Sequence, residues 1–192
     1  MASSRETSKL AKALAEARAK WTRGDKPARE AVGPGEESVW DYPRPPEIRP
    51  APARARVDFA GEIIADSKDA VRIVETAGAP VYYFPPSDVR VEFLRETAGR
   101  SFCEWKGEAI YYDVVIGDRR APDAAFAYPK PLDDLRRGFD RIAGWFGFYP
   151  ARVDGCFLGD ERVTPQPGGF YAGWVTQNIK GPIKGAPGTH HW

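Results

Sequence analysis

A thiol, an amine and two carboxylates lie close together in the stretch SFCEWKGEAIYYD at residues 101–113. Cys103 would be a nucleophile if Lys106 or a histidine lowered its pKa, because the thiolate is the reactive form of cysteine. The alternative is a small buried core residue, since free cysteine usually behaves in that way. The stretch itself has the pattern of two strands joined by a turn at Gly107.

Strand alternation limits what this stretch can do. Successive side chains on a strand point to opposite faces of the sheet. Glu104 and Lys106 should therefore share one face, and Cys103 and Trp105 should lie on the other. We expect that one pocket does not hold every polar group of the stretch.

A further carboxylate, Glu75, follows an apolar run and is a candidate general acid or ligand anchor. Partial burial would raise the pKa of a carboxylate unless a cation pairs with it. The alternative is a structural salt bridge from Glu75 to Arg44, Arg72 or Lys106.

Aromatic residues of the expected strands are candidates for a pocket wall around a ring-shaped ligand. An anionic ligand would also need a cation, and Lys106 is the candidate. Strand aromatics can equally form an ordinary core. The candidate ligand-binding residues are Lys106, Glu104, Trp105, Tyr83, Tyr111 and Arg44, and the candidate catalytic residues are Glu75 and Cys103.

The sequence predicts no metal site and leaves the cofactor unknown. Its only histidines, His190 and His191, are adjacent near the C-terminus and lack a diagnostic ligand spacing. Cys103 and Cys156 are far apart and form no C-x-x-C pair, which suits a reducing compartment.

Composition favours a β-rich protein with many turns. Hydrophobic residues make up 42% of the 192 residues, while 18 prolines and 19 glycines divide the chain into short pieces. A net charge of +1 gives no argument for binding nucleic acid or an anionic membrane. Because no apolar leader or membrane span is evident, we expect a soluble, cytoplasmic protein.

Three regions follow from the pattern along the chain. Residues 1–38 should form a basic amphipathic helix, at 5–23, and a linker. Residues 39–163 should form a β-rich core domain. Residues 164–192 are rich in glycine, proline and aromatics, and we expect them to pack on the body or on a neighbouring subunit.

The expected fold is mainly β, a β-rich α+β protein with a compact single-domain curled sheet that is barrel-like or sandwich-like. Besides the N-terminal helix, short helices are expected at 68–70 and 132–143, the latter because Leu135, Phe139 and Ile142 have helical spacing. Strands are expected at 55–59, 62–65, 71–75, 81–84, 102–105, 108–116, 124–128, 147–149 and 153–158.

An ordered series of short motifs resembles a bacterial family of unknown function, domain of unknown function 427. The series comprises W-x-YPRPP from Trp40, GEIIADS from Gly61, Glu75-Thr76, VYYFP from Val81, CEWKG from Cys103 and AYP from Ala127. It covers roughly residues 40–160, and the segment from Gly168 to Thr189 resembles a C-terminal extension of some members. The resemblance implies a compact, mainly β domain labelled nucleotidyltransferase-like.

The residues themselves give the label little support. Nucleotidyl transfer usually needs a Gly-Ser loop and alternating acidic residues that hold magnesium. The chain has no Gly-Ser dipeptide and no Asp-x-Asp triplet, and phosphate-binding glycine loops are missing too. We therefore carry over no catalytic residue and leave open whether the protein is an enzyme.

Two functions compete at this point. The first is a β domain that binds a small ring-bearing or anionic, nucleotide-like ligand in an aromatic-lined pocket. The second is a non-catalytic interaction module or homo-oligomer that uses the N-terminal helix and the C-terminal tail. A nucleic-acid contact through residues 5–29 would show a steep salt dependence and is the weakest of the three.

Overall fold

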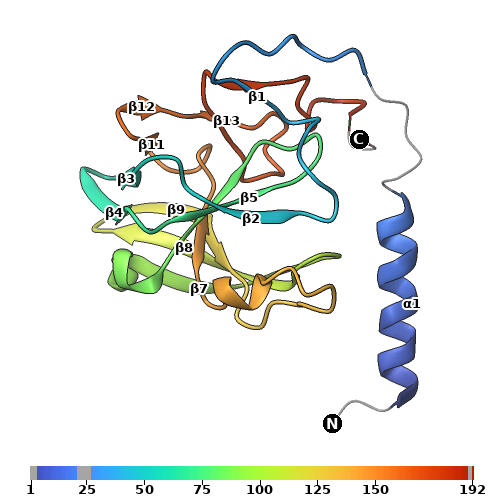
Figure 1. Cartoon of the computed structure of the whole chain (residues 1–192). Helices are drawn as coiled ribbons and strands as arrows, with labels where there is room; N and C mark the ends of the chain where they lie inside the picture. Colours follow the sequence, from blue (N-terminus) through green and yellow to red (C-terminus); the bar gives the residue numbers. More distant parts are fainter. Residues whose placement is uncertain (1–3, 21–26, 190–191) are drawn as a thin grey trace.

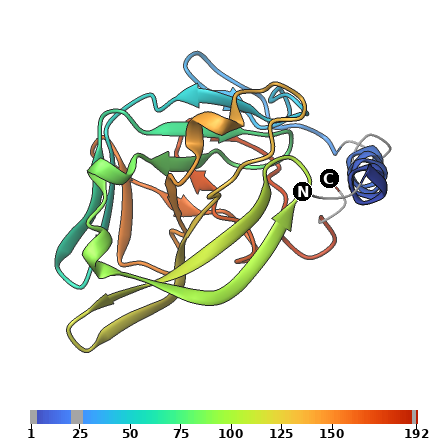
Figure 2. The ribbon, with the colours of Figure 1, turned by 90° about the horizontal axis from the view of Figure 1, so that it is seen from below.

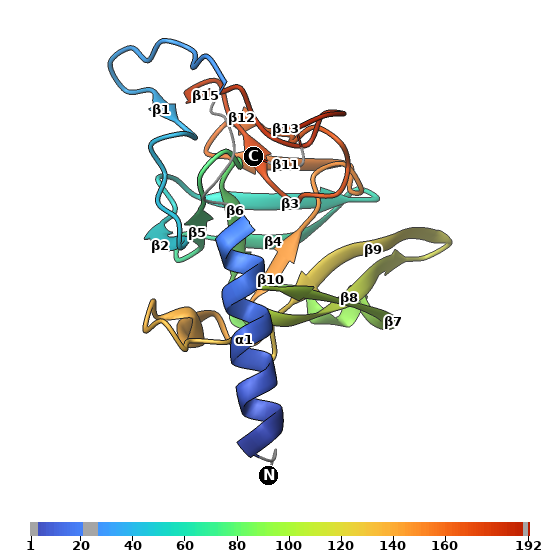
Figure 3. The same ribbon diagram turned by 90° about the vertical axis from the view of Figure 1, so that its right-hand side faces the viewer.

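The computed structural model describes residues 4–20, 27–189 and 192. One α-helix, α1 (Ser4–Lys20), stands at the side of a β-rich body (Figures 1 and 3). None of the described helices is both long and apolar enough to cross a membrane. The expected fold class, mainly β with an N-terminal helix, is confirmed.

The body contains two larger antiparallel sheets. The seven-stranded sheet has the order β2-β5-β6-β10-β9-β8-β7, and the four-stranded sheet has the order β12-β11-β3-β4. In the larger sheet the strands are β2 (Glu47–Pro50), β5 (Val71–Val74), β6 (Val81–Phe84), β10 (Phe146–Phe148), β9 (Arg119–Ala127), β8 (Gly107–Ile116) and β7 (Leu94–Cys103). In the smaller sheet they are β12 (Glu161–Arg162), β11 (Gly155–Leu158), β3 (Ala55–Phe59) and β4 (Glu62–Ser67).

Two short pairs of strands attach the ends of the chain to this body. The strand β1 (Glu37–Ser38) runs parallel to β15 (Ile179–Lys180), and β13 (Thr164–Pro165) is antiparallel to β14 (Trp174–Val175). Single 3-10 turns occur at η1 (Pro86–Asp88), η2 (Val91–Phe93) and η3 (Phe139–Ile142).

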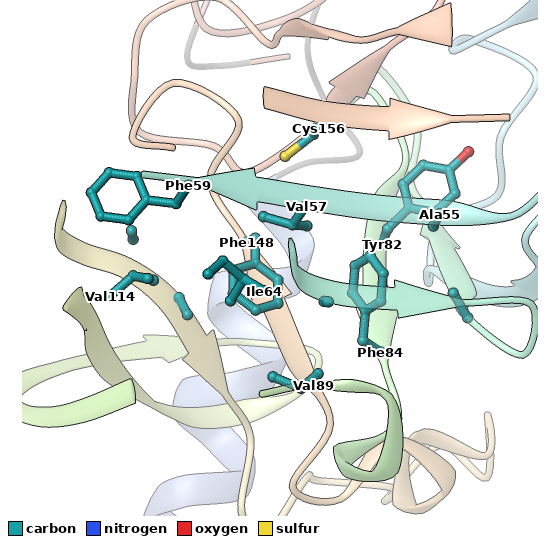
Figure 4. Close-up of a cluster of buried hydrophobic side chains, with 14 of the residues drawn as sticks. Ala55, Val57, Phe59, Ile64, Tyr82, Phe84, Val89, Val114, Phe148 and Cys156 are labelled. Atoms are coloured by element: carbon teal, nitrogen blue, oxygen red, sulfur yellow. The ribbon is translucent and has the colours of Figure 1, made fainter. Parts of the chain in front are cut away.

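The main core lies between the two larger sheets, which face one another as in a sandwich. Val57 and Ile64 of the smaller sheet are fully buried with Phe84 and Phe148 of the larger sheet (Figure 4). Alternation along β6 explains how one strand serves two cores, because Tyr82 and Phe84 point to this side. Tyr83 therefore belongs to a second cluster.

The second cluster is aromatic and includes β6, β8 and β9 of the larger sheet. The rings of Tyr83, Phe126 and Tyr128 pack edge-on or tilted at centroid distances of 5.8–6.4 Å. Gly147 permits this packing, since a Cβ there would meet Phe126 at 2.5 Å. The cluster is the floor on which the candidate site is built.

The prediction of a helix at 132–143 is wrong, except that its last turn forms the 3-10 turn η3. Arg136 and Gly138 both have positive φ, 52° and 76°, which interrupts a right-handed helix. The Asp133 carboxylate accepts hydrogen bonds from the backbone amides of Arg137, Gly138 and Phe139, so the side chain organises a turn instead.

Residues 68–70 form a bend rather than the expected helical turn. The Ser67 hydroxyl accepts a hydrogen bond from the amide of Asp69 at 3.0 Å. Such a side-chain contact stabilises a turn between β4 and β5 without any helical hydrogen bond.

Candidate functional site

A cavity of about 430 Å³ opens over the second aromatic cluster. Four parts of the chain form it: the sheet face, the turn after β5, the β7–β8 hairpin and the C-terminal segment. Its aromatic residues are Tyr83, Phe102, Trp105, Tyr111, Phe126, Tyr128, Tyr149, Phe170 and Tyr171. Its ionisable side chains other than tyrosine are those of Glu75, Cys103, Glu104, Lys106 and Lys184.

The hairpin differs from the strand pattern that alternation predicts. The strand β7 ends at Cys103, which pairs with Gly107 at the start of β8, so Glu104–Lys106 is a loop. Gly107 has φ 87°, a conformation that glycine adopts without strain. As a result Cys103, Glu104, Trp105 and Lys106 all line the cavity, and the expected division between two faces is wrong.

Two carboxylates of the stretch, Glu108 and Asp113, stay outside the cavity, so one pocket does not hold every polar group, as we expected. The buried carboxylate of Asp113 accepts hydrogen bonds from Arg120 at 2.6 Å and from the amide of Asp123 at 2.9 Å. Glu108 is exposed. The turn end of the hairpin thus lines the cavity, whereas Asp113 further along β8 is paired with structural partners.

Lys106 is a buried cation in this cavity, with 8% of its surface exposed. Its Nζ lies 5.5 Å from the ring centroid of Tyr128, and this ammonium group forms no hydrogen bond or ion pair within the described residues. Burial disfavours its charged form, whereas coulombic attraction to the ionised forms of nearby acidic groups, Cys103 and Tyr128 above all and then Tyr83 and Glu75, favours it. Together they hold the pKa of Lys106 well above the ordinary lysine value.

Glu75 lies in a small group of charges at the edge of the cavity. Its Oε1 is 3.2 Å from Arg44 Nε and 3.8 Å from Lys184 Nζ. Arg44 is one of the three partners that the structural alternative named for Glu75. Arg44 does not line the cavity, and it also donates a hydrogen bond to the Thr76 carbonyl at 2.8 Å.

Lys184 is a site residue that sequence reasoning missed, and only 5% of its surface is exposed. Its backbone amide donates to Ala77 O, and its carbonyl accepts from Gln166 Nε2, both at 2.9 Å. Its Nζ lies 5.0 Å from the Tyr171 ring centroid. The only sequence signal was a lysine placed among the aromatics of the tail.

The two buried lysines differ in their protonation. Burial lowers the pKa of Lys184 below the ordinary lysine value, and the nearby Glu75 offsets this only in part. The pKa of Lys106 is shifted the opposite way. One cavity therefore holds a lysine that stays charged and a lysine that gives up its proton more easily.

The tyrosines of the floor are neutral hydrogen-bonding groups at physiological pH. Burial raises the pKa of Tyr83 to about 12, and it raises the pKa of Tyr128 well above the ordinary tyrosine value. Tyr111 stacks on Tyr149 at 6.5 Å, and its hydroxyl lies 2.7 Å from Ser101 Oγ. These groups provide ring faces and hydroxyls rather than charge.

The hairpin loop is supported from outside by α1. The Arg18 guanidinium lies 5.1 Å from the Trp105 ring centroid and donates to Glu104 O at 2.9 Å. It also pairs with both carboxylate oxygens of Asp134, at 2.8 and 2.9 Å. Figure 2 shows α1 end-on at this side of the body. Trp105 Nε1 is buried and has no hydrogen-bond partner within the described residues.

The cysteines and histidines have different placements. Cys103 is half-buried at the cavity, whereas Cys156 is buried in the main core. His190 and His191 lie outside the described residues. Among the described residues, no group of three His, Cys, Asp or Glu side chains is arranged to hold a metal ion.

A family model described as Domain of unknown function (DUF427), with the name NTP_transf_9, matches residues 47–159. The chain belongs to this family. The resemblance inferred from the motifs is therefore confirmed. The DUF427 match includes the hairpin with Lys106, but it ends before the segment that carries Tyr171 and Lys184. No curated protein matches the chain.

The lowered pKa of Lys184 predicts a pH-dependent contribution to stability. The lysine binds its proton more tightly in the unfolded chain than in the folded chain. At pH values between the lowered pKa and the ordinary lysine pKa of about 10.4, the unfolded chain therefore holds more protons than the folded chain. As pH rises toward about 10, the free energy of unfolding of the wild-type protein should therefore increase relative to that of Lys184→Met. Urea denaturation of both proteins at several pH values measures this difference.

The exposed residue Lys130 provides the control for this experiment. Lys130→Met should show no comparable change with pH relative to wild type. A difference between wild type and Lys184→Met that stays constant with pH would contradict the assigned direction of the shift.

Proposed function

We propose that the cavity binds a small ring-bearing anion, such as a nucleotide-like compound or an aromatic carboxylate. The observation that supports this most is the buried ammonium group of Lys106, whose Nζ has no hydrogen bond or ion pair among the described residues. A buried charge is costly unless a partner compensates it. A bound carboxylate or phosphate would supply that partner.

The cavity's size and lining support the same ligand class. Small-molecule sites commonly have roughly 300–1,000 Å³, with apolar walls and a few polar groups. At about 430 Å³ this cavity suits a single ring with one or two substituents. The faces of Tyr83, Phe126 and Tyr128 provide stacking or edge contacts. Trp105 Nε1 is an additional buried donor without a described partner.

Replacing Lys106 with methionine should weaken binding of a ring anion at least tenfold, which is about 1.4 kcal/mol. Methionine retains an unbranched apolar chain but removes the charge that would pair with the anion. Titration calorimetry with 4-(hydroxymethyl)benzoate and with a panel of nucleoside monophosphates measures the effect. Lys130→Met is the matched control and should bind as wild type does.

Two results would count against the proposal. One is an affinity that is unchanged in Lys106→Met, which would remove this lysine from the site. The other is the absence of binding by every ring anion tested in a protein whose melting curve is normal.

The alternative function is that of an interaction module, and two features of α1 support it. This helix contacts the hairpin through Arg18, while Leu10 is 44% exposed. A second copy of the chain is the partner we propose in that case, and sedimentation would detect it. We also place the protein in the cytoplasm, because Cys103 and Cys156 are both free thiols.

A further inference from the structure

We propose that Lys184 is a nucleophilic amine that forms a Schiff base with a carbonyl group on the ring-bearing anion, while Lys106 holds the anionic group. This inference rests on the proposed function of the cavity and narrows its ligand to an aromatic aldehyde or ketone with an acidic substituent. Lys184 lies outside the residues that the DUF427 match covers.

The geometry places an amine where a bound ring would present its substituent. Both lysines line the same cavity. The backbone of Lys184 is held on both sides, by Ala77 O and by Gln166 Nε2. The lysine Cε passes close to Gly78, since a Cβ at that glycine would lie 3.4 Å from it. A side chain that is positioned before the ligand arrives loses little conformational freedom on reaction.

The charges around Lys184 favour its reactive form. Desolvation of a lysine or a neighbouring cation activates the amine, because only the neutral amine is a nucleophile. Burial is the main cause of its lowered pKa, and two cations act in the same direction while two carboxylates oppose them. Within the part of the chain that the structure describes, the charged and titratable groups that face it include Arg44, Lys106, Glu75, Glu104 and Tyr171.

The reaction balances without an oxidant or a metal. The Nζ lone pair attacks the carbonyl carbon, a C–N bond forms, and the carbonyl oxygen becomes a hydroxyl group after proton transfer. That hydroxyl group leaves as water when a proton is returned to it, and a C=N bond remains. Both N–H protons of the amine therefore end on the departing water, and Glu75, with Oε1 at 3.8 Å from Nζ, is placed to carry each of them in turn from nitrogen to oxygen.

Lys106 provides an internal comparison in the same cavity. It is as deeply buried as Lys184, yet its pKa is raised and its amine stays protonated. A protonated amine has no lone pair for attack. Geometry separates the two amines as well, because a carboxylate oxygen, Glu75 Oε1, lies 3.8 Å from Lys184 Nζ, whereas Lys106 Nζ has no ion pair within the described residues.

The test treats the full-length protein with substoichiometric 4-formylbenzoate and sodium cyanoborohydride, which reduces an imine to a stable secondary amine. Peptide mass spectrometry then locates the adduct. We expect modification of wild-type Lys184 at least tenfold faster than of any other lysine. Lys184→Arg should lose the adduct, and Lys106→Met should slow its formation because the carboxylate is no longer held.

Adducts spread over surface lysines such as Lys130, at rates equal to that of Lys184, would overturn the proposal. This mapping uses the wild-type protein and does not depend on how the variants fold. The analogue 4-(hydroxymethyl)benzoate lacks the aldehyde group. It therefore distinguishes failure of the Schiff-base proposal from failure of the proposed binding function. Binding of the analogue without a Lys184 adduct refutes the Schiff base alone, whereas no binding of either compound refutes the proposed function as well.

Discussion

Replacing Trp174 with alanine should lower the free energy of unfolding by about 3–5 kcal/mol, as expected for truncation of a fully buried aromatic residue. Only 1% of this side chain is exposed. Its ring packs on Tyr82 at 4.7 Å and on Phe84 at 5.9 Å, and its Nε1 donates to Phe148 O at 3.3 Å. Alanine would leave a cavity in the main core and would remove the hydrogen bond to Phe148 O.

Urea denaturation followed by circular dichroism measures this effect without relying on tryptophan fluorescence. Phe170 offers a matched control, because it is an aromatic residue of the same segment but is 70% exposed. Phe170→Ala should change stability by no more than about 0.5 kcal/mol. If Trp174→Ala were equally mild, residues 164–192 would contribute little to the core.

Replacing Gly185 with alanine should destabilise the protein by at least about 2 kcal/mol and should abolish ligand binding in the cavity. A Cβ at this position would lie 2.0 Å from Pro167 O, and φ is +126°. Gly168 meets the same obstacle from the other side, since its Cβ would lie 1.9 Å from Gly185 O. Separating the two backbones would displace Gly185, which follows Lys184, or Pro167, which follows Gln166, the residue that donates to Lys184 O.

Gly188 is a control that distinguishes the effect of a steric clash from the effect of positive φ alone. It also has positive φ, +83°, but no atom lies within 4 Å of the position a Cβ would take. Gly188→Ala should cost only about 1 kcal/mol and should leave binding intact. Urea denaturation and calorimetry with 4-(hydroxymethyl)benzoate on both variants provide the comparison. Equal effects at the two glycines would mean that the close crossing does not position Lys184.

The strands that are best predicted from the sequence are those buried on both faces, whose side chains alternate between the main core and the second aromatic cluster. The strand β6 was predicted with its observed bounds, Val81–Phe84, because its aromatic and β-branched residues are typical of a buried strand. The first part of β7 was missed. Its sequence, LRETAGRS, is mostly polar since the strand lies at the sheet edge and is largely exposed.

The candidate site was harder to predict because its parts are distant in sequence. The hairpin residues were found locally, but alternation failed where Glu104–Lys106 leave the strand. The group formed by Glu75, Arg44 and Lys184 depends on how the tail folds back over the turn after β5. Local periodicity contains no information about such a contact, so no pattern could have paired Glu75 with Lys184.

The parallel pair of β1 and β15 also determines how the protein would respond to force. The backbone amide of Glu37 donates to Asn178 O at 2.8 Å, and that of Val39 donates to Lys180 O at 3.0 Å. The entering and leaving segments of the chain are therefore hydrogen-bonded side by side. A pull on the two ends would draw these parallel strands past each other in opposite directions. The hydrogen bonds would then be loaded together in shear instead of opening one after another, and the body behind them would stay folded until the pair broke.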